Sequence, residues 1–101
     1  MENNIKSACQ LFEELGYKFV SYGDEHIVEF DKVVIKDYEY KKIVFDIRRK
    51  FFWAGYFKNK YDSNGKLINK IHTIVVLDIE ELKAINQQCK ELGWLDEWWT
   101  V

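Results

Sequence analysis

The side chains best suited to catalysis are few in this chain. His26 and His72 are its two histidines, and the pattern places both inside strands, where we expect them to face solvent. No glycine-rich phosphate loop, nucleophile elbow or His-Glu helix motif accompanies them. Neighbouring carboxylates occur, as in Glu13-Glu14 and Glu80-Glu81, but adjacent helical residues diverge by about 100° and cannot share a proton. The sequence therefore predicts a protein that is not an enzyme and needs no cofactor.

Metal binding is not expected either. Residues 62–65 resemble the start of a calcium loop, but such a loop needs a glutamate at its twelfth position, where this chain has Thr73. A hairpin turn is the favoured interpretation of these residues. Cys9 and Cys89 supply too few ligands for zinc, and we expect both as reduced thiols on the apolar faces of helices. A disulfide joining the two helices is the alternative.

Binding chemistry is concentrated in residues 41–70, which we call the basic aromatic segment. It holds nine Lys or Arg against two Asp, a charge of +7 in a chain of net charge −2, together with seven aromatic residues. Cations hold phosphates or acidic groups, and exposed rings stack on bases or anchor protein interfaces. The residues predicted to contact a partner here are Arg48, Arg49, Lys50, Trp53, Tyr56, Lys58 and Lys60.

Three interpretations of the segment stay open. All its aromatics could be core or edge-protecting residues, with lysines keeping an edge strand soluble. It could instead contact an acidic protein or a nucleic acid. The overall negative charge weighs against duplex DNA, whose binding proteins are usually basic.

The C-terminal tail is a second candidate, because three of the last eight residues are tryptophan. Trp98 and Trp99 therefore join the predicted partner-binding residues. Either the tail packs back along the sheet or it docks on a partner, including a second copy that would make a homodimer.

Two helices and a run of strands must position these groups. Apolar residues at helical spacing predict a helix over residues 4–15, ended by Gly16, and another over 79–92, ended by Gly93. Asp78 and Glu81 form a capping box for the second helix.

Between the helices, strands are predicted at residues 17–22, 25–30, 33–36, 43–47, 51–57 and 69–77, with turns at 23–24, 31–32, 48–50 and 62–65. The expected fold is α+β: an antiparallel meandering sheet of five or six strands with the N- and C-terminal helices packed on one face.

The chain length of 101 residues predicts a single domain over residues 1–101. No window is apolar enough to span a bilayer, and the polar N-terminus lacks a signal peptide. We expect a cytoplasmic protein with no membrane contact.

Residues 78–95 read Asp-Ile-Glu-Glu-Leu-Lys-Ala-Ile-Asn-Gln-Gln-Cys-Lys-Glu-Leu-Gly-Trp-Leu. This run resembles the C-terminal helix of small uncharacterised proteins encoded by phages and prophages of low-GC Gram-positive bacteria. The resemblance implies a non-enzymatic accessory protein of the bacterial host cytoplasm. Such a protein would bind a host or phage protein and could inhibit a defence protein such as a nucleic-acid-guided nuclease. The alternative is a nucleic-acid-binding accessory module that uses the basic aromatic segment.

Overall fold

The computed structural model describes residues 5–95, and their contacts group into two compact units. Residues 17–76 form a sheet unit, and the residues up to Gly16 together with those from Leu77 form a helical unit.

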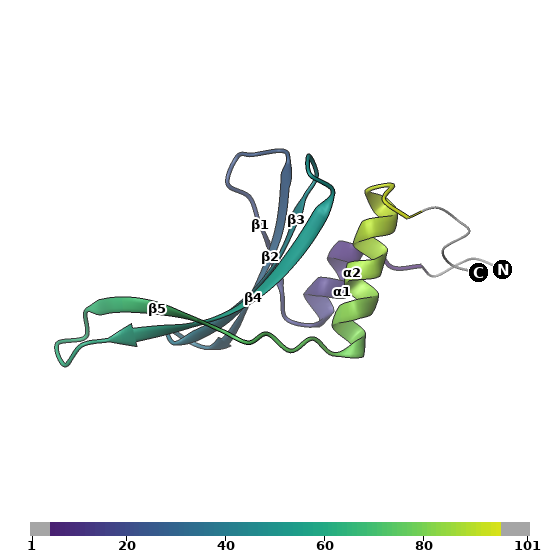
Figure 1. Cartoon of the computed structure of the whole chain (residues 1–101). Helices are drawn as coiled ribbons and strands as arrows, with labels where there is room; N and C mark the ends of the chain where they lie inside the picture. Colours follow the sequence, from purple (N-terminus) through teal and green to yellow (C-terminus); the bar gives the residue numbers. More distant parts are fainter. Residues whose placement is uncertain (1–4, 96–101) are drawn as a thin grey trace. The chain divides into compact units, whose positions relative to one another are not determined.

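The sheet unit is an antiparallel meander in which each strand pairs with the next one along the chain (Figure 1). Its strands are β1 (Lys18–Val20), β2 (Ile27–Ile35), β3 (Glu39–Asp46), β4 (Phe51–Tyr61) and β5 (Leu67–Thr73). With helix α1 (Ala8–Glu14) before the sheet and helix α2 (Ile79–Glu91) after it, the α+β class and the meander are confirmed, with five strands.

One predicted turn is wrong. Residues 31–32 lie inside β2, which runs without interruption from Ile27 to beyond Val33. Asp31 stands opposite Lys18 on β1 and Lys42 on β3, and Lys32 stands opposite Lys41. Asp31 is accommodated by lysines on both neighbouring strands, whereas Lys32 has its Nζ 5.6 Å from the centre of the Tyr17 ring.

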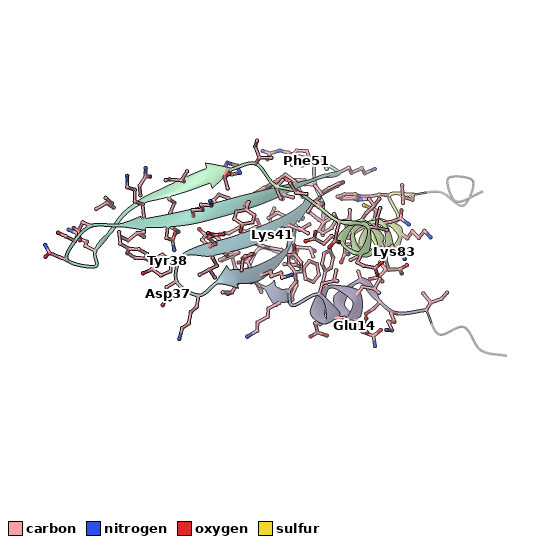
Figure 2. The ribbon with its side chains drawn as sticks, turned by 90° about the horizontal axis from the view of Figure 1, so that it is seen from below. Glu14, Asp37, Tyr38, Lys41, Phe51 and Lys83 are labelled. Carbon is pink, nitrogen blue, oxygen red and sulfur yellow. The ribbon has the colours of Figure 1, made fainter. Side chains whose placement is uncertain are left out.

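Both faces of the sheet carry buried side chains, and Figure 2 draws the side chains on the ribbon. Residues directly opposite each other in an antiparallel pair lie on the same face, so the register assigns each side chain to one of them. The Phe45 face carries Phe30, Ile43 and Phe45, each no more than 2% exposed, and Phe30 and Phe45 meet edge to face at 6.4 Å. The Trp53 face carries the buried Val44 opposite Trp53, which is partly exposed.

β4 is longer than its neighbour β5. Its pairing with β3 covers residues 51–58, whereas its register with β5 begins only at Tyr56, which stands opposite Thr73. Residues 51–55 therefore have no strand partner on the β5 side within the described part of the chain. The last predicted strand also ends earlier than expected, at Thr73 and not at residue 77.

In the helical unit, α1 and α2 pack against each other, and the Ala8 N–H donates to Glu91 Oε2 at 2.8 Å. The capping box of Asp78 and Glu81 is confirmed at the start of α2. α1 begins at Ala8 and not near residue 4, because Ser7 and Gln10 form a second capping box there.

Cys9 is exposed, so its predicted burial on an apolar helix face is wrong. The buried residues of α1 are Ala8 and Phe12, which share one face at a spacing of four, and Cys9 falls outside that face. Cys89 is buried as predicted, and burial raises the pKa of its thiol. Both cysteines are free.

Candidate functional site

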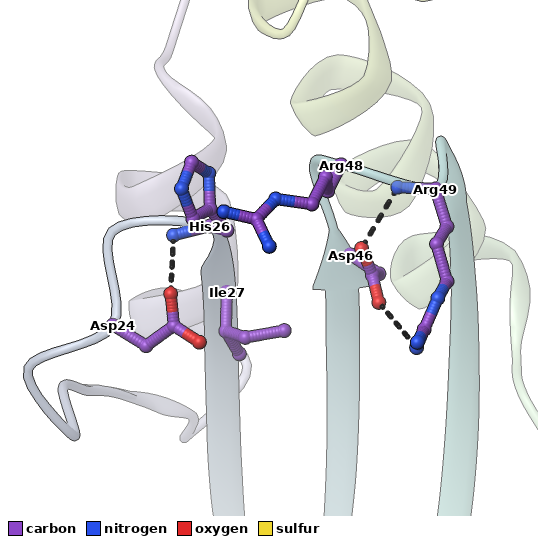
Figure 3. Close-up of a pocket in the computed structure, with 6 residues that line it drawn as sticks. All are labelled: Asp24, His26, Ile27, Asp46, Arg48 and Arg49. Carbon is purple, nitrogen blue, oxygen red and sulfur yellow. Dashed lines mark hydrogen bonds and ion pairs between the residues drawn. The ribbon is translucent and has the colours of Figure 1, made fainter.

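The turn between β3 and β4, residues 47–50, presents three cations. Asp46 organises it: its Oδ1 accepts from the Arg49 N–H at 2.9 Å, and its Oδ2 lies 3.4 Å from the Arg49 guanidinium (Figure 3). The Lys50 N–H donates to the Asp46 carbonyl at 2.9 Å, but the exposed side chains of Arg48 and Lys50 make no hydrogen bond or ion pair with any other described residue. The turn therefore offers two cations that are available to a partner.

A small pocket of ≈190 Å³ opens beside this turn, and Figure 3 shows the residues around it. Arg48 and Arg49 come from the turn, with the Arg48 side chain extending toward His26, and His26 and Asp24 come from the residues just before β2. The backbone N–H of His26 donates to Asp24 Oδ1 at 2.8 Å. His26 thus precedes β2 and does not lie inside a strand as predicted. The two carboxylates balance the two guanidinium groups, so the pocket has little net charge.

Directly after the turn come three consecutive aromatic residues, Phe51, Phe52 and Trp53, which we call the aromatic triplet. Their exposed fractions are 45%, 42% and 42%. Phe52 lies on the Phe45 face, with its ring 5.7 Å from that of Phe45, whereas Phe51 and Trp53 lie on the opposite face. Side chains alternate between faces along a strand, so burial on one face would hide part of the triplet. Instead all three rings remain partly exposed beside the cations of the turn.

Further along the Trp53 face, three rings from neighbouring strands form a stack. Phe57 lies between Tyr40 at 5.2 Å and His72 at 4.7 Å, with nearly parallel ring planes. The ammonium groups of Lys42 and Lys70 each lie 5.9 Å from the centre of the Tyr40 ring. Because Lys42 and Lys70 already contact the Tyr40 ring of this aromatic stack, the stack is less accessible to a binding partner than the aromatic triplet is.

The Trp53 face also carries two carboxylates that the sequence analysis did not identify. Glu29 and Asp31 stand two positions apart on β2, and Lys42 Nζ lies 3.4 Å from Glu29 Oε2. The Tyr22 hydroxyl also donates to this oxygen, at 3.1 Å. The spacing of two within a strand is the signal that could have revealed the pair, but the false turn at residues 31–32 concealed it.

The environment of this pair changes its protonation. Burial, a hydrogen bond with Glu29 and the charge of Glu29 together raise the pKa of Asp31 to about 7. Burial alone would lower the pKa of Lys42, but the charges of Glu29 and Asp31 raise it above its ordinary value. The pKa of a carboxyl group is raised in this way in structural pairs as well as in catalytic ones. Lys42 and Tyr22 both contact Glu29, which is typical of a structural network.

The structure separates the predicted partner-binding residues. Arg48, Arg49, Lys50 and Trp53 lie together at the start of β4, as the sequence suggested. Tyr56 lies on the opposite face from Trp53, with its hydroxyl donating to Glu39, a bond that raises the pKa of Tyr56.

Lys58 and Lys60 are exposed near the far end of β4. At about 3.3 Å per residue, Lys60 stands roughly 23 Å from Trp53 along the strand. Trp98 and Trp99 lie outside the described residues.

Within residues 5–95, no group of three or more His, Cys, Asp or Glu side chains is placed to hold a metal ion. None of the helices described is long and apolar enough to cross a membrane. Comparisons with protein-family models, curated proteins and solved structures returned no match for this chain.

Proposed function

We propose that this protein acts without catalysis, by binding a partner protein at the surface formed by Arg48, Lys50 and the aromatic triplet. The observation that carries the proposal is the exposure of three consecutive aromatic rings beside two cations that have no partner among the described residues. Tryptophan and arginine are enriched among the residues that dominate binding energy at protein interfaces. The cations favour a partner with an acidic surface.

In its finer form, the proposal identifies the partner as a host protein, and specifically a defence protein that this chain inhibits. Support for that step comes from the resemblance of residues 78–95 to phage and prophage proteins. The coarser proposal, a protein-binding surface at the start of β4, is independent of that resemblance.

The test compares two double charge reversals that alter net charge equally. Arg48→Glu/Lys50→Glu changes the proposed surface, whereas Lys60→Glu/Lys66→Glu changes exposed cations near the opposite end of β4. Each tagged protein is incubated with lysate of a low-GC Gram-positive bacterium, and the retained proteins are identified. Affinity for the purified partner is then measured by calorimetry.

We expect the first variant to weaken binding by roughly tenfold or more and the second by less than about twofold. Equal losses in the two variants, or none in the first, would contradict the proposal. Circular dichroism on both variants confirms that they are folded.

A second candidate function is favoured by one observation on the Trp53 face. Phe51, Trp53 and Phe57 lie on it at alternate positions of β4, with Gly55 between the last two. Rings on one strand face, with lysines nearby, can stack on the bases of a single-stranded nucleic acid.

Adding a thymidine oligonucleotide should then shift the Trp53 indole N–H signal in NMR spectra. The affinity should also fall steeply with salt, because phosphate binding releases counterions. An unchanged Trp53 signal, with the protein folded, eliminates this candidate.

A further inference from the structure

Residues 51–55 of β4 form an open strand edge. These residues pair with β3 on one side, without a register shift, while β5 starts only at Tyr56 on the other. Alternate residues of a strand direct their backbone groups to the same side, and no backbone hydrogen bond within the described residues satisfies those of residues 51–55 that point away from β3. An open edge of this kind is a template for an additional strand.

The other edges of the sheet carry features that discourage pairing. The pairing of β5 with β4 is irregular next to Tyr61, and β5 carries Lys70, with Lys66 just before it. β1 is only three residues long, and the part of β2 that extends past it carries Lys32 and a register irregularity between Val33 and Ile35. Bulges, lysines and short length are the means by which proteins protect exposed edges. Residues 51–55 have no charge, no proline and no bulge.

The chemistry around this edge defines what it can accept. The aromatic triplet offers apolar contacts on both faces, since Phe52 points to one face and Phe51 and Trp53 to the other. Arg48 and Lys50 stand immediately before its first residue and lack partners in the described chain. An added strand would meet apolar surface along its length and positive charge at one end.

We infer that residues 51–55 accept an extended segment of the partner protein as an added β-strand, with acidic side chains at the end beside Arg48 and Lys50. Backbone hydrogen bonds supply affinity in this mode of recognition, and alternate side chains supply specificity. The inference rests on the proposed function, because it names the part of the partner that binds.

A second copy of this chain fits the edge less well. An antiparallel pair of copies centred on Trp53 would bring Arg48 of each copy toward Lys58 of the other, just beyond the ends of the paired residues. Like charges brought together in this way disfavour the pair. The presence of β5 beside Tyr56 also limits such a pair to five residues.

The test uses synthetic peptides of alternating valine and threonine whose last residues are two glutamates or, in a matched peptide, two lysines. Two further versions of the acidic peptide carry N-methyl groups on alternate backbone amides, one version in each phase. An added strand presents only alternate amides to its neighbour, so one phase blocks the pairing and the other leaves it intact.

Hydrogen exchange of the full-length protein is followed by NMR. We expect the acidic peptide to slow exchange of edge amides within residues 51–55 by about fivefold or more at saturation. One N-methylated version should abolish this protection and the other should preserve it. Equal behaviour of the two versions, or equal protection by the lysine peptide, would overturn the inference.

Protection by an oligonucleotide in place of the acidic peptide would overturn it as well. If the peptide experiment fails but Arg48→Glu/Lys50→Glu still weakens partner binding more than the control variant does, the proposed function stands without the added strand. The two proposals are therefore distinguishable.

Discussion

The turns before and after β4 are built on the same device. Each begins with an aspartate whose carboxylate accepts backbone N–H groups: Asp46 accepts from Arg49, and Asp62 accepts from Asn64 and Lys66, all at 2.9 Å. Each turn also contains a residue with positive φ. The second turn uses Gly65, at +80°, whereas the first uses Lys50, at +57°.

Both turns are basic, but the structures around them differ. After the second turn the chain pairs with β4, and Tyr61 nearby donates to the Asp37 carbonyl and contacts the Tyr38 ring at 5.4 Å. The first turn leads into exposed rings and an open strand edge. Two basic ends of one strand are therefore not equivalent sites. Open backbone and exposed apolar surface, more than charge, distinguish the end that we propose to bind a partner.

The largest effect is expected midway between the two ends, at Gly55. A Cβ on Gly55 would lie 2.6 Å from Cε2 of Phe57, whose ring is held between Tyr40 and His72. Gly55→Ala should lower the free energy of unfolding by about 2 kcal/mol, as overpacking does. At the second turn, Gly65→Ala meets open space, so its cost should be about 1 kcal/mol, from positive φ alone.

Urea denaturation of both variants measures this difference. Adding Phe57→Ala to Gly55→Ala removes the clash, so the double variant should be more stable than the sum of the two single losses predicts. Strict additivity would contradict this account of Gly55.

Asp31→Asn changes neither of the two turns that flank β4, so it serves as a reference. We expect it to change how the stability of the protein depends on pH. The pKa of Asp31 is raised from 3.8 to about 7 in the folded protein. The folded state therefore holds a proton that the unfolded state loses, and stability falls as the pH rises from about 4 to about 7. Lys18, Lys42, Glu29 and Tyr22 are the charged or titratable groups around Asp31.

The free energy of unfolding of Asp31→Asn, relative to that of the original protein, should rise by about 1 to 2 kcal/mol between pH 5 and pH 8. This energy is set below the full value of the pKa shift because the carboxyl group is partly exposed. Urea denaturation at both pH values measures the gain. Glu25→Gln, which replaces an exposed carboxylate before β2, is the control and should show no such gain. An identical pH profile for the original protein and Asp31→Asn would contradict the prediction.

The two capping aspartates allow a matched comparison of the turns. Asp46 is 8% exposed and pairs with Arg49, whereas Asp62 only caps backbone groups and is half-buried. Asp46→Ala should lower the free energy of unfolding by about 1.5 kcal/mol, and Asp62→Ala should lower it by about 1 kcal/mol. Thermal denaturation measures both, and a larger loss at Asp62 would show that the first turn is held in some other way.

The smallest effect is expected at the strained lysine. Lys50→Gly relieves a positive φ and should raise the free energy of unfolding by about 0.5 kcal/mol. The same change removes a cation from the proposed surface, so partner affinity should fall while stability rises. Lys50→Asn, which also tolerates this conformation, controls for the backbone effect. A loss of stability in both variants would contradict the strain.

Sequence patterns predicted the features that depend on neighbouring residues. The capping box of Asp78 and Glu81, the glycine after each helix and the turn at residues 62–65 are all present. The start of α1 was also readable from Ser7 and Gln10, a capping-box spacing that was overlooked in favour of the longer apolar stripe.

Features that depend on distant residues could not be predicted in this way. The continuity of β2 through Asp31 depends on lysines of β1 and β3, and the open edge depends on where β5 stops. The placement of Tyr56, in contrast, follows from local alternation: its spacing of three from Trp53 predicts the opposite strand face, and the register agrees. Arg48, Lys50 and Trp53 are close in sequence and stay close in space.

The meander also suggests an order of events as the chain folds. Every strand of the sheet unit pairs with the next one, so its contacts close short loops, which are entropically cheap and form quickly. The helical unit must instead bring together segments such as Ala8 and Glu91, which are 83 positions apart. During synthesis α1, with seven residues, is too short to persist alone and waits for α2 to leave the ribosome. The sheet, with its binding edge, is therefore expected to assemble first.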